Sequence, residues 1–136
     1  MFIDPTPDAV DALMSREITG PVVMLNLLRF RQIADYSAAP GLAPDRPISG
    51  REAYDRYASH AGRFLASAGG TVQLLGEGGR FLIGPPAERW DLVMLVRYPD
   101  LEAFLTMVSD DAYRAGVGHR TAALEDSRLL PIEPSA

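Results

Sequence analysis

Two segments of the chain, residues 22–30 and 90–98, are apolar at almost every position rather than at alternate positions. Successive side chains of a β-strand point to opposite faces, so a strand with one face in water alternates apolar and polar residues. If both segments are strands, each presents apolar side chains to both faces of a sheet. A fold that contains them has to cover both faces of its central strands.

Helix and loop signals surround the first of these strands. Thr6 can cap an N-terminal helix, which has to end before Gly20-Pro21. Residues 33–48 are rich in proline and show little periodicity, which predicts an unusually long loop. The segment Ser49-Gly-Arg-Glu52 is a capping-box pattern, so we expect an amphipathic helix from there to Gly69-Gly70.

The second half of the chain ends in a strand that Pro131 places at a sheet edge, because proline has no N–H to donate to a neighbouring strand. Asp100 can cap a helix, and Ser109, which two aspartates follow, predicts a second helix start. The elements expected after residue 70 are strands at 71–77, 81–83, 90–98 and 128–132, a turn or bulge at 78–79, and helical structure from 100 to 125 interrupted near 109.

The order of the expected elements is β-α-β-β-α-β, the split βαβ arrangement of ferredoxin-like folds. We therefore predict an α+β fold, a ferredoxin-like sandwich with an antiparallel sheet and an extra N-terminal helix in residues 1–20. The first and third strands are central in that topology, which agrees with their apolar composition. A chain of 136 residues has the usual size of one domain, so residues 1–136 are expected to form a single domain.

The sheet of this fold has one face that its own helices do not cover. The composition of the two central strands makes that face apolar, and exposed apolar patches of this size are uncommon on soluble monomers. A second copy, packed sheet against sheet about a two-fold axis, covers it most simply, so we predict a homodimer. A bulge that shifts the face assignment of one strand is the alternative. In the first strand, one face would carry Val22, Met24, Asn26 and Leu28, and the other Val23, Leu25, Leu27 and Arg29. In the third strand, one face would carry Trp90, Leu92, Met94 and Val96, and the other Asp91, Val93, Leu95 and Arg97.

Composition excludes several classes of function. The chain has no cysteine, which rules out disulfides, thiolate metal sites and a nucleophilic thiol. The longest apolar stretch, residues 22–28, is too short to span a membrane, and the first residues lack a signal-peptide pattern, so we expect a cytoplasmic protein with no membrane partner. The net charge is −5 and the 13 basic residues are scattered, which argues against nucleic acid as a partner.

Several segments carry a recognisable pattern: residues 21–29 (PVVMLNLLR), residues 49–57 (SGREAYDRY), Trp90-Asp91 with Tyr98-Pro99, and the later Tyr113 and Arg120. With them the chain resembles the domain-of-unknown-function family numbered 1330, within the dimeric α/β-barrel superfamily. The resemblance covers residues 20–132 and implies the same fold and a sheet-to-sheet dimer. The superfamily includes cofactor-free monooxygenases, haem-degrading oxygenases, small isomerases and proteins without known catalysis, so the fold does not assign a reaction.

Asn26 and Trp90 are the candidates that the resemblance points to. In the oxygenases of the superfamily, an asparagine on the first strand and a tryptophan on the third line a pocket between sheet and helices. The residues themselves leave alternatives open: the Asn26 amide serves a ligand or is satisfied by backbone and water, and Trp90 is a pocket wall or a core residue. The haem-degrading members carry a helical histidine soon after that tryptophan, whereas the next histidine here is His119, so we expect no haem.

Four further residues complete the candidate site. Tyr54 and Tyr57 are one helical turn apart and point their hydroxyls into one cavity or to the surface, and Met94 belongs to the strand face of the pocket. Arg120 can hold a carboxylate bidentately or pair with a neighbouring acid. His60 is expected to be solvated on the polar helix face, and we expect no metal or cofactor site. The predicted substrate-binding residues are Asn26, Trp90, Tyr54, Tyr57, Met94 and Arg120.

Two functions remain open at this point, and the sequence does not decide whether the chain is an enzyme. The first is a small-molecule-binding dimeric barrel without catalysis, whose apolar pocket between sheet and helices takes a small apolar or aromatic ligand. It is favoured by the lack of a recognisable acid, base and nucleophile constellation. The alternative is a cofactor-free monooxygenase or isomerase for a small aromatic or polyketide-like substrate, in which Asn26 polarises an oxygen and Trp90 stacks on the ring.

Overall fold

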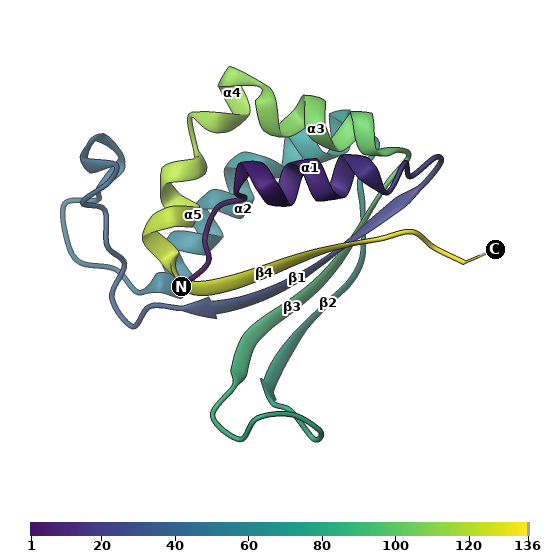
Figure 1. Cartoon of the computed structure of the whole chain (residues 1–136). Helices are drawn as coiled ribbons and strands as arrows, with labels where there is room; N and C mark the ends of the chain where they lie inside the picture. Colours follow the sequence, from purple (N-terminus) through teal and green to yellow (C-terminus); the bar gives the residue numbers. More distant parts are fainter. Residues whose placement is uncertain (136) are drawn as a thin grey trace.

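The computed structural model describes residues 1–135 and places helices on one face of a four-stranded antiparallel sheet (Figure 1). The strand order is β2-β3-β1-β4, so β1 and β3 are central and β4 lies at an edge. This is the predicted ferredoxin-like topology, including the edge position of the strand that contains Pro131. The elements are α1 (Pro7–Ser15), β1 (Val22–Phe30), a 3-10 turn (Pro40–Leu42), α2 (Gly50–Ser67), β2 (Thr71–Arg80), β3 (Arg89–Tyr98), α3 (Leu101–Ser109), α4 (Asp111–Arg114), α5 (Val117–Ala123) and β4 (Leu124–Ile132).

Local capping bonds explain where the helices begin. The side chains of Thr6, Ser49 and Asp100 each accept a hydrogen bond from a backbone N–H of the first helical turn, as predicted. The start of the second helix in the C-terminal helical region differs by one residue from the prediction. Asp110, and not Ser109, caps α4, because its carboxylate accepts from the N–H groups of both Ala112 and Tyr113.

The predicted short strand at residues 81–83 is wrong. Strand β2 continues through Gly78-Gly79 to Arg80, and Phe81, Leu82 and Ile83 lie in the turn that joins β2 to β3. Glycine can remain in an antiparallel ladder, so the two glycines do not end the strand. The pairing ends at Arg80–Arg89, and the chain between them contains Pro85-Pro86, which cannot donate to a ladder.

The helix-facing side of the sheet forms the core. Alternate residues of the central strands point toward the helices, and β1 contributes Val22, Met24 and Leu28, each at most 1% exposed. One buried cluster contains Val22, Met24, Val96, Tyr98, Leu101, Met107 and Tyr113, and a second contains Leu28, Ile48, Ala53, Tyr54, Leu92, Ala123 and Leu124. These contacts fix the faces of both central strands.

The remaining alternate residues form the opposite surface, which we call the open face. One row of directly paired residues crosses all four strands and consists of Leu130, Leu25, Leu95 and Leu74. Directly paired residues of antiparallel strands point to the same side, so this row is a continuous leucine stripe. In one copy Leu74 is 48% and Leu130 is 54% exposed. Val23, Leu27 and Val93 extend the stripe on either side.

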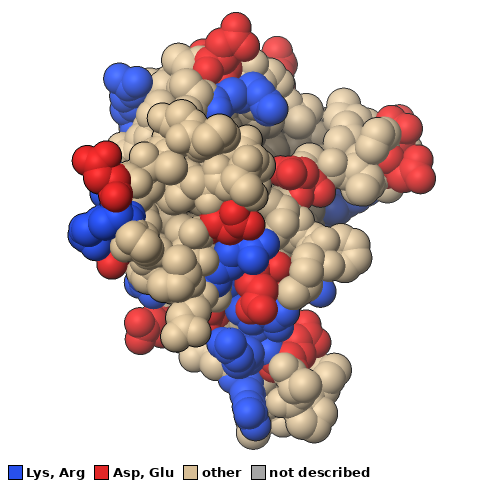
Figure 2. Space-filling view, turned by 90° about the vertical axis from the view of Figure 1, so that its left-hand side faces the viewer, with Lys and Arg blue, Asp and Glu red and all other residues tan. Residues whose placement is uncertain are grey.

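The long loop between β1 and α2 is fixed to the helices rather than free. The N–H of Asp35 donates to the carbonyl of Ala122 at 2.9 Å, and Tyr36 packs against the second buried cluster. Its ends meet where Gly50 begins α2, since the N–H of Gly50 donates to the carbonyl of Arg31 at 3.0 Å. Charges of both signs are interspersed over the face seen in Figure 2. None of the helices within residues 1–135 has the length and apolar character needed to span a membrane.

The junction at Gly50 gives a direct test of this packing. A methyl group at Gly50 would collide with the carbonyl oxygens of Arg31 and Ala123, so Gly50→Ala should lower the free energy of unfolding by about 1 to 3 kcal/mol. Gly62→Ala is the matched control in the same helix. It has nothing within 4 Å and should raise the free energy of unfolding by about 0.5 to 1 kcal/mol. Urea titrations that give both variants the same stability would contradict the packing.

Candidate functional site

Four of the five tyrosines gather between the sheet and the helices, and we call Tyr54, Tyr57, Tyr98 and Tyr113 the tyrosine cluster. The rings of Tyr54 and Tyr57 lie one turn apart on α2 with centroids 5.4 Å apart. The hydroxyls of Tyr57 and Tyr113 are hydrogen-bonded at 2.6 Å. Tyr113 and Tyr98 belong to the same buried cluster, which joins α2, α4 and β3 at this point.

Burial controls the ionisation of these phenols. It raises the pKa of Tyr54 to about 12, although the nearby positive charge of Arg120 opposes the shift. Burial and the adjacent Tyr113 hydroxyl raise the pKa of Tyr57, and burial raises the pKa of Tyr98. The phenols of Tyr54, Tyr57 and Tyr98 are therefore neutral at physiological pH. They can donate hydrogen bonds to a carbonyl or carboxylate oxygen, but they are not bases there.

Arg120 supplies the positive charge beside the tyrosine cluster. It lies on α5, is half-buried, and donates through one Nη to the carbonyl of Ile3 at 2.8 Å. A guanidinium has five N–H donors, so this bond uses only part of its capacity. Its positive charge lowers the pKa of both Tyr54 and Tyr57, against the effect of burial. The N-terminal segment at Ile3 therefore covers the arginine side of the cluster.

Asn26 and Met94 lie on the helix-facing side of the sheet. They are direct partners in the β1–β3 pairing, and Met94 packs against the cluster that contains Tyr98 and Tyr113. The Nδ2 of Asn26 donates to the carbonyl of Met24 at 3.2 Å within the same strand. This bond uses one of the four hydrogen bonds that an amide side chain can make. Asn26, Met94, Tyr54, Tyr57 and Arg120 thus all belong to the layer between sheet and helices.

Trp90 is not brought to these residues. Its indole is 2% exposed and is contacted by the guanidiniums of Arg29 and Arg128, at 5.8 and 5.0 Å from the ring centroid. Trp90 belongs to neither buried cluster, so a pocket that it shares with Asn26 stays a prediction. Next to Trp90, the carboxylate of Asp91 accepts from the N–H of Phe30 at 2.9 Å. The β1–β3 ladder ends at Leu28–Leu92, and Trp90 lies beyond it, where β3 pairs only with β2.

Histidine and tyrosine contacts that the sequence analysis missed hold the site together. His60 is not simply solvated, since its Nε2 donates to the carbonyls of Ala112 and Tyr113 at 2.9 and 3.1 Å and so fixes α4 on α2. Tyr36 of the long loop bonds through its hydroxyl to Nδ1 of His119 at 2.7 Å. Burial, helped by the positive charge of Arg56, lowers the pKa of His119. Tyr113 was signalled in the sequence by the family pattern that includes it and by the aspartate pair that starts its short helix.

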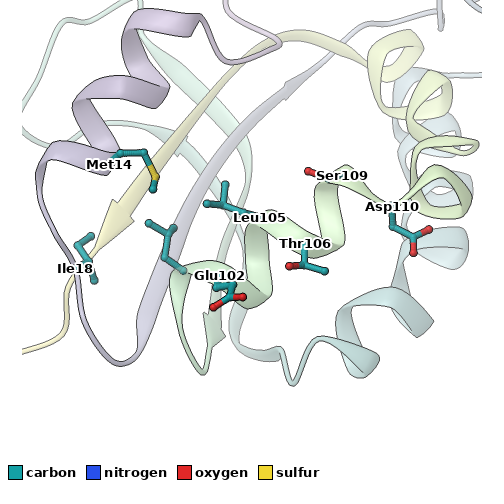
Figure 3. A pocket seen from close by; sticks show the side chains of 8 residues that line it. Met14, Ile18, Glu102, Leu105, Thr106, Ser109 and Asp110 are labelled. Atoms are coloured by element: carbon teal, nitrogen blue, oxygen red, sulfur yellow. The ribbon is translucent and has the colours of Figure 1, made fainter.

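Two surface hollows are lined by residues other than those of the tyrosine cluster. The larger, about 810 Å³, lies between α1 and α3, where Met14 and Ile18 face Leu105 and Glu102 (Figure 3). The second, about 400 Å³, lies between α2 and α3 and is lined in part by Phe64, Ala68 and Met107. None of the predicted substrate-binding residues lines either hollow. Their assignment as ligand contacts stays a prediction.

Comparison with known proteins shows a ferredoxin-like fold and a family for this chain. A dimeric protein of unknown function with a ferredoxin-like fold from Bacteroides fragilis aligns with a TM-score of 0.51 at 13% identity, over 85% of this chain and 98% of that one, and shows the fold alone. The chain belongs to the family described as Domain of unknown function (DUF1330), whose model matches residues 46–133. No curated protein matches the chain.

Two solved structures are similar to the chain in sequence as well as in fold. The RPA0582 protein of Rhodopseudomonas palustris, a protein of unknown function, is 40% identical and aligns with a TM-score of 0.83, over 98% of this chain and 97% of that one. A methylated form of the RPA0582 protein aligns with a TM-score of 0.86 at the same 40% identity, over 99% and 96% of the two chains. The N-terminal helix and the long loop are therefore included in the alignment.

The buried phenols predict a specific sensitivity to alkali. Below about pH 10 both the folded and the unfolded chain keep the phenol protons, whereas above it the unfolded chain releases protons that the folded chain holds. The free energy of unfolding should therefore fall as the pH rises, by about 1.4 kcal/mol per pH unit for each tyrosine that stays protonated. In Tyr54→Phe the loss between pH 10 and 12 should be shallower. Urea titrations at several pH values measure it, and identical slopes in both proteins would contradict the burial of this phenol.

Proposed function

We propose that this protein is a homodimer, packed through the open faces of its two sheets, that binds a small aromatic or otherwise apolar molecule bearing a carboxylate or carbonyl group. Each copy holds its own ligand site, between sheet and helices, at the tyrosine cluster. The observation that carries the proposal is that β1 and β3 present apolar side chains on both faces of the sheet. Alternate residues point toward the tyrosine cluster, and the residues between them belong to the open face with its leucine stripe.

The leucine stripe supports the dimer. A monomer would leave Leu25, Leu95, Leu74 and Leu130 in contact with water across the whole width of the sheet. Burying such a surface contributes about 25 cal/mol for each Å² of apolar area removed from water. A two-fold axis buries the same surface on both copies at once and closes the assembly. The Bacteroides fragilis protein of similar fold is described as dimeric, which agrees with this proposal.

The chemistry of the tyrosine cluster supports the ligand class. Tyr54 and Tyr57 offer aromatic ring faces that suit stacking on a flat apolar molecule. Their neutral hydroxyls and the Asn26 amide can hydrogen-bond an oxygen of that molecule, and Arg120 can hold a carboxylate in bidentate fashion. A binding site of this kind is mostly apolar with a few placed polar groups. A bound ligand would displace part of Ile3 and of the long loop from the tyrosine cluster.

Catalysis is the second candidate, favoured by the Tyr57–Tyr113 hydrogen bond. A neutral phenol whose own hydroxyl is oriented by a second phenol can stabilise an oxyanion that develops on a bound substrate. Together with Asn26 this would suit a cofactor-free monooxygenase or isomerase. Oxygen consumption or isomerisation with a compound that binds would favour catalysis, and binding without turnover across a broad panel would favour the first proposal.

The dimer is tested by a charge on the leucine stripe. Leu25→Asp should produce monomers or unfolded protein at micromolar concentration, because the carboxylate would be buried without a partner. Ile33→Asp is the control, since Ile33 is 58% exposed on the long loop and should leave the dimer intact. Sedimentation velocity measures the outcome. A wild-type monomer throughout the micromolar range, or a Leu25→Asp dimer of normal stability, would remove the basis for the dimer.

The ligand site is tested by comparing benzoate with benzamide as probes in thermal-shift and calorimetric titrations. Arg120→Gln should weaken benzoate binding at least tenfold and leave benzamide binding nearly unchanged, because only the acid uses the guanidinium charge. Asn26→Ala should weaken both probes while changing stability little. If Asn26→Ala instead costs about 1 to 3 kcal/mol of stability with unchanged affinities, the amide is structural and does not belong to the site.

A further inference from the structure

The turn between β2 and β3 exposes a large apolar tip. Phe81 is 45%, Leu82 is 99% and Ile83 is 92% exposed. The hairpin that carries the tip projects from the sheet on the side away from the helices (Figure 1), and it is the lower projection in Figure 2, where uncharged atoms form its end beside basic side chains. The tip is therefore directed toward the side of the sheet that carries the open face.

The end of this hairpin lacks support from the rest of the sheet. Strand β3 pairs with β1 only as far as Leu92, whereas its pairing with β2 continues to Arg80–Arg89. Residues 77–91, which we call the hairpin arm, thus extend as a two-stranded ribbon past the β1–β3 ladder, and the root of the arm is held where Asp91 bonds Phe30 and where Arg29 and Arg128 contact Trp90. A ribbon of two strands is only marginally stable in water by itself. Contact of the three apolar tip residues with another surface would stabilise such an arm.

Gly76, at the root of the arm, indicates what that surface is. It lies in the same open-face row as Val93 and Leu27, so its missing side chain would point to the side where the tip projects. A Cβ at this position would meet nothing within 4 Å, and its φ is not positive, so neither space nor backbone conformation within this chain requires glycine. Glycine inside a strand often marks the close approach of another backbone. The second copy on the open face is the chain that would make this approach.

We propose that the hairpin arm is a dimerisation arm: the tip residues Phe81, Leu82 and Ile83 of one copy reach over the edge of the sheet-to-sheet interface and bury themselves against the second copy. This inference rests on the proposed dimer and adds a second contact region to it. The two-fold axis duplicates the arm, so each copy clasps the other. The arm contact is continuous with the leucine stripe through Val93 and Gly76.

A single thiol at the tip tests the arm, because the chain has no cysteine of its own. In Leu82→Cys the thiol should react with a maleimide several-fold more slowly in the dimer than after dilution to monomers. Met14→Cys is the control on α1, where Met14 is 52% exposed and lies on the helix side. Its rate should not depend on protein concentration. A Leu82→Cys rate that is equally independent of concentration overturns the proposal.

The double variant Leu82→Ser with Ile83→Ser provides the second measurement. Both side chains are almost fully exposed in one copy, so the substitutions should leave the monomer folded while raising the dimer dissociation constant about tenfold or more. A wild-type dimer whose dissociation constant does not change in this variant overturns the arm and leaves the dimer standing. A wild-type monomer overturns both. An arm that stays free in the dimer and binds lipid vesicles instead also overturns the proposal.

Discussion

Burial of the alternate side chains of β1 and β3 against the helices is the constraint on which the rest of the structure depends. Once Met24, Leu28 and Val96 are fixed toward the helices, Leu25, Leu27 and Leu95 have to point the other way. The apolar open face is therefore a direct consequence of the core, since the same strands supply both. A sheet with one wet face would need polar residues at the second set of positions, and this sequence has leucine and valine there.

The elements that the sequence predicted well are those set by short-range signals. The caps at Thr6, Ser49 and Asp100 act within three residues, and the apolar runs of β1 and β3 are visible without knowledge of their partners. The end of β2 was misjudged because Gly78-Gly79 looks like a turn in the sequence. The ladder with β3 continues past both glycines to Arg80, and that pairing is a long-range contact that composition does not reveal.

The candidate site was only partly predictable for the same reason. Tyr54 and Tyr57 share one helix, so their proximity follows from helical spacing. Tyr113 joins them because α4 is fixed on α2 by the His60 bonds to backbone carbonyls, a contact between residues more than fifty positions apart. Tyr98 comes from β3 through the packing of the helices on the sheet. Trp90 lies beyond the last β1–β3 pair, Leu28–Leu92, and contacts Arg29 and Arg128. None of these contacts has a signature in the local sequence.

The register of β1 connects the two halves of the proposed function. Leu25 and Asn26 are neighbours in the chain but point to opposite faces, so a slip by one residue would carry the amide into the leucine stripe and a leucine into the tyrosine cluster. Two irregularities, between Arg29 and Phe30 in the pairing with β4 and between Val72 and Leu74 in the pairing of β2 with β3, interrupt the uniform ladder. A ladder interrupted in this way cannot slide without losing its bulges. The position of Asn26 beside Met94 and the continuity of the leucine stripe are thus two results of one fixed register.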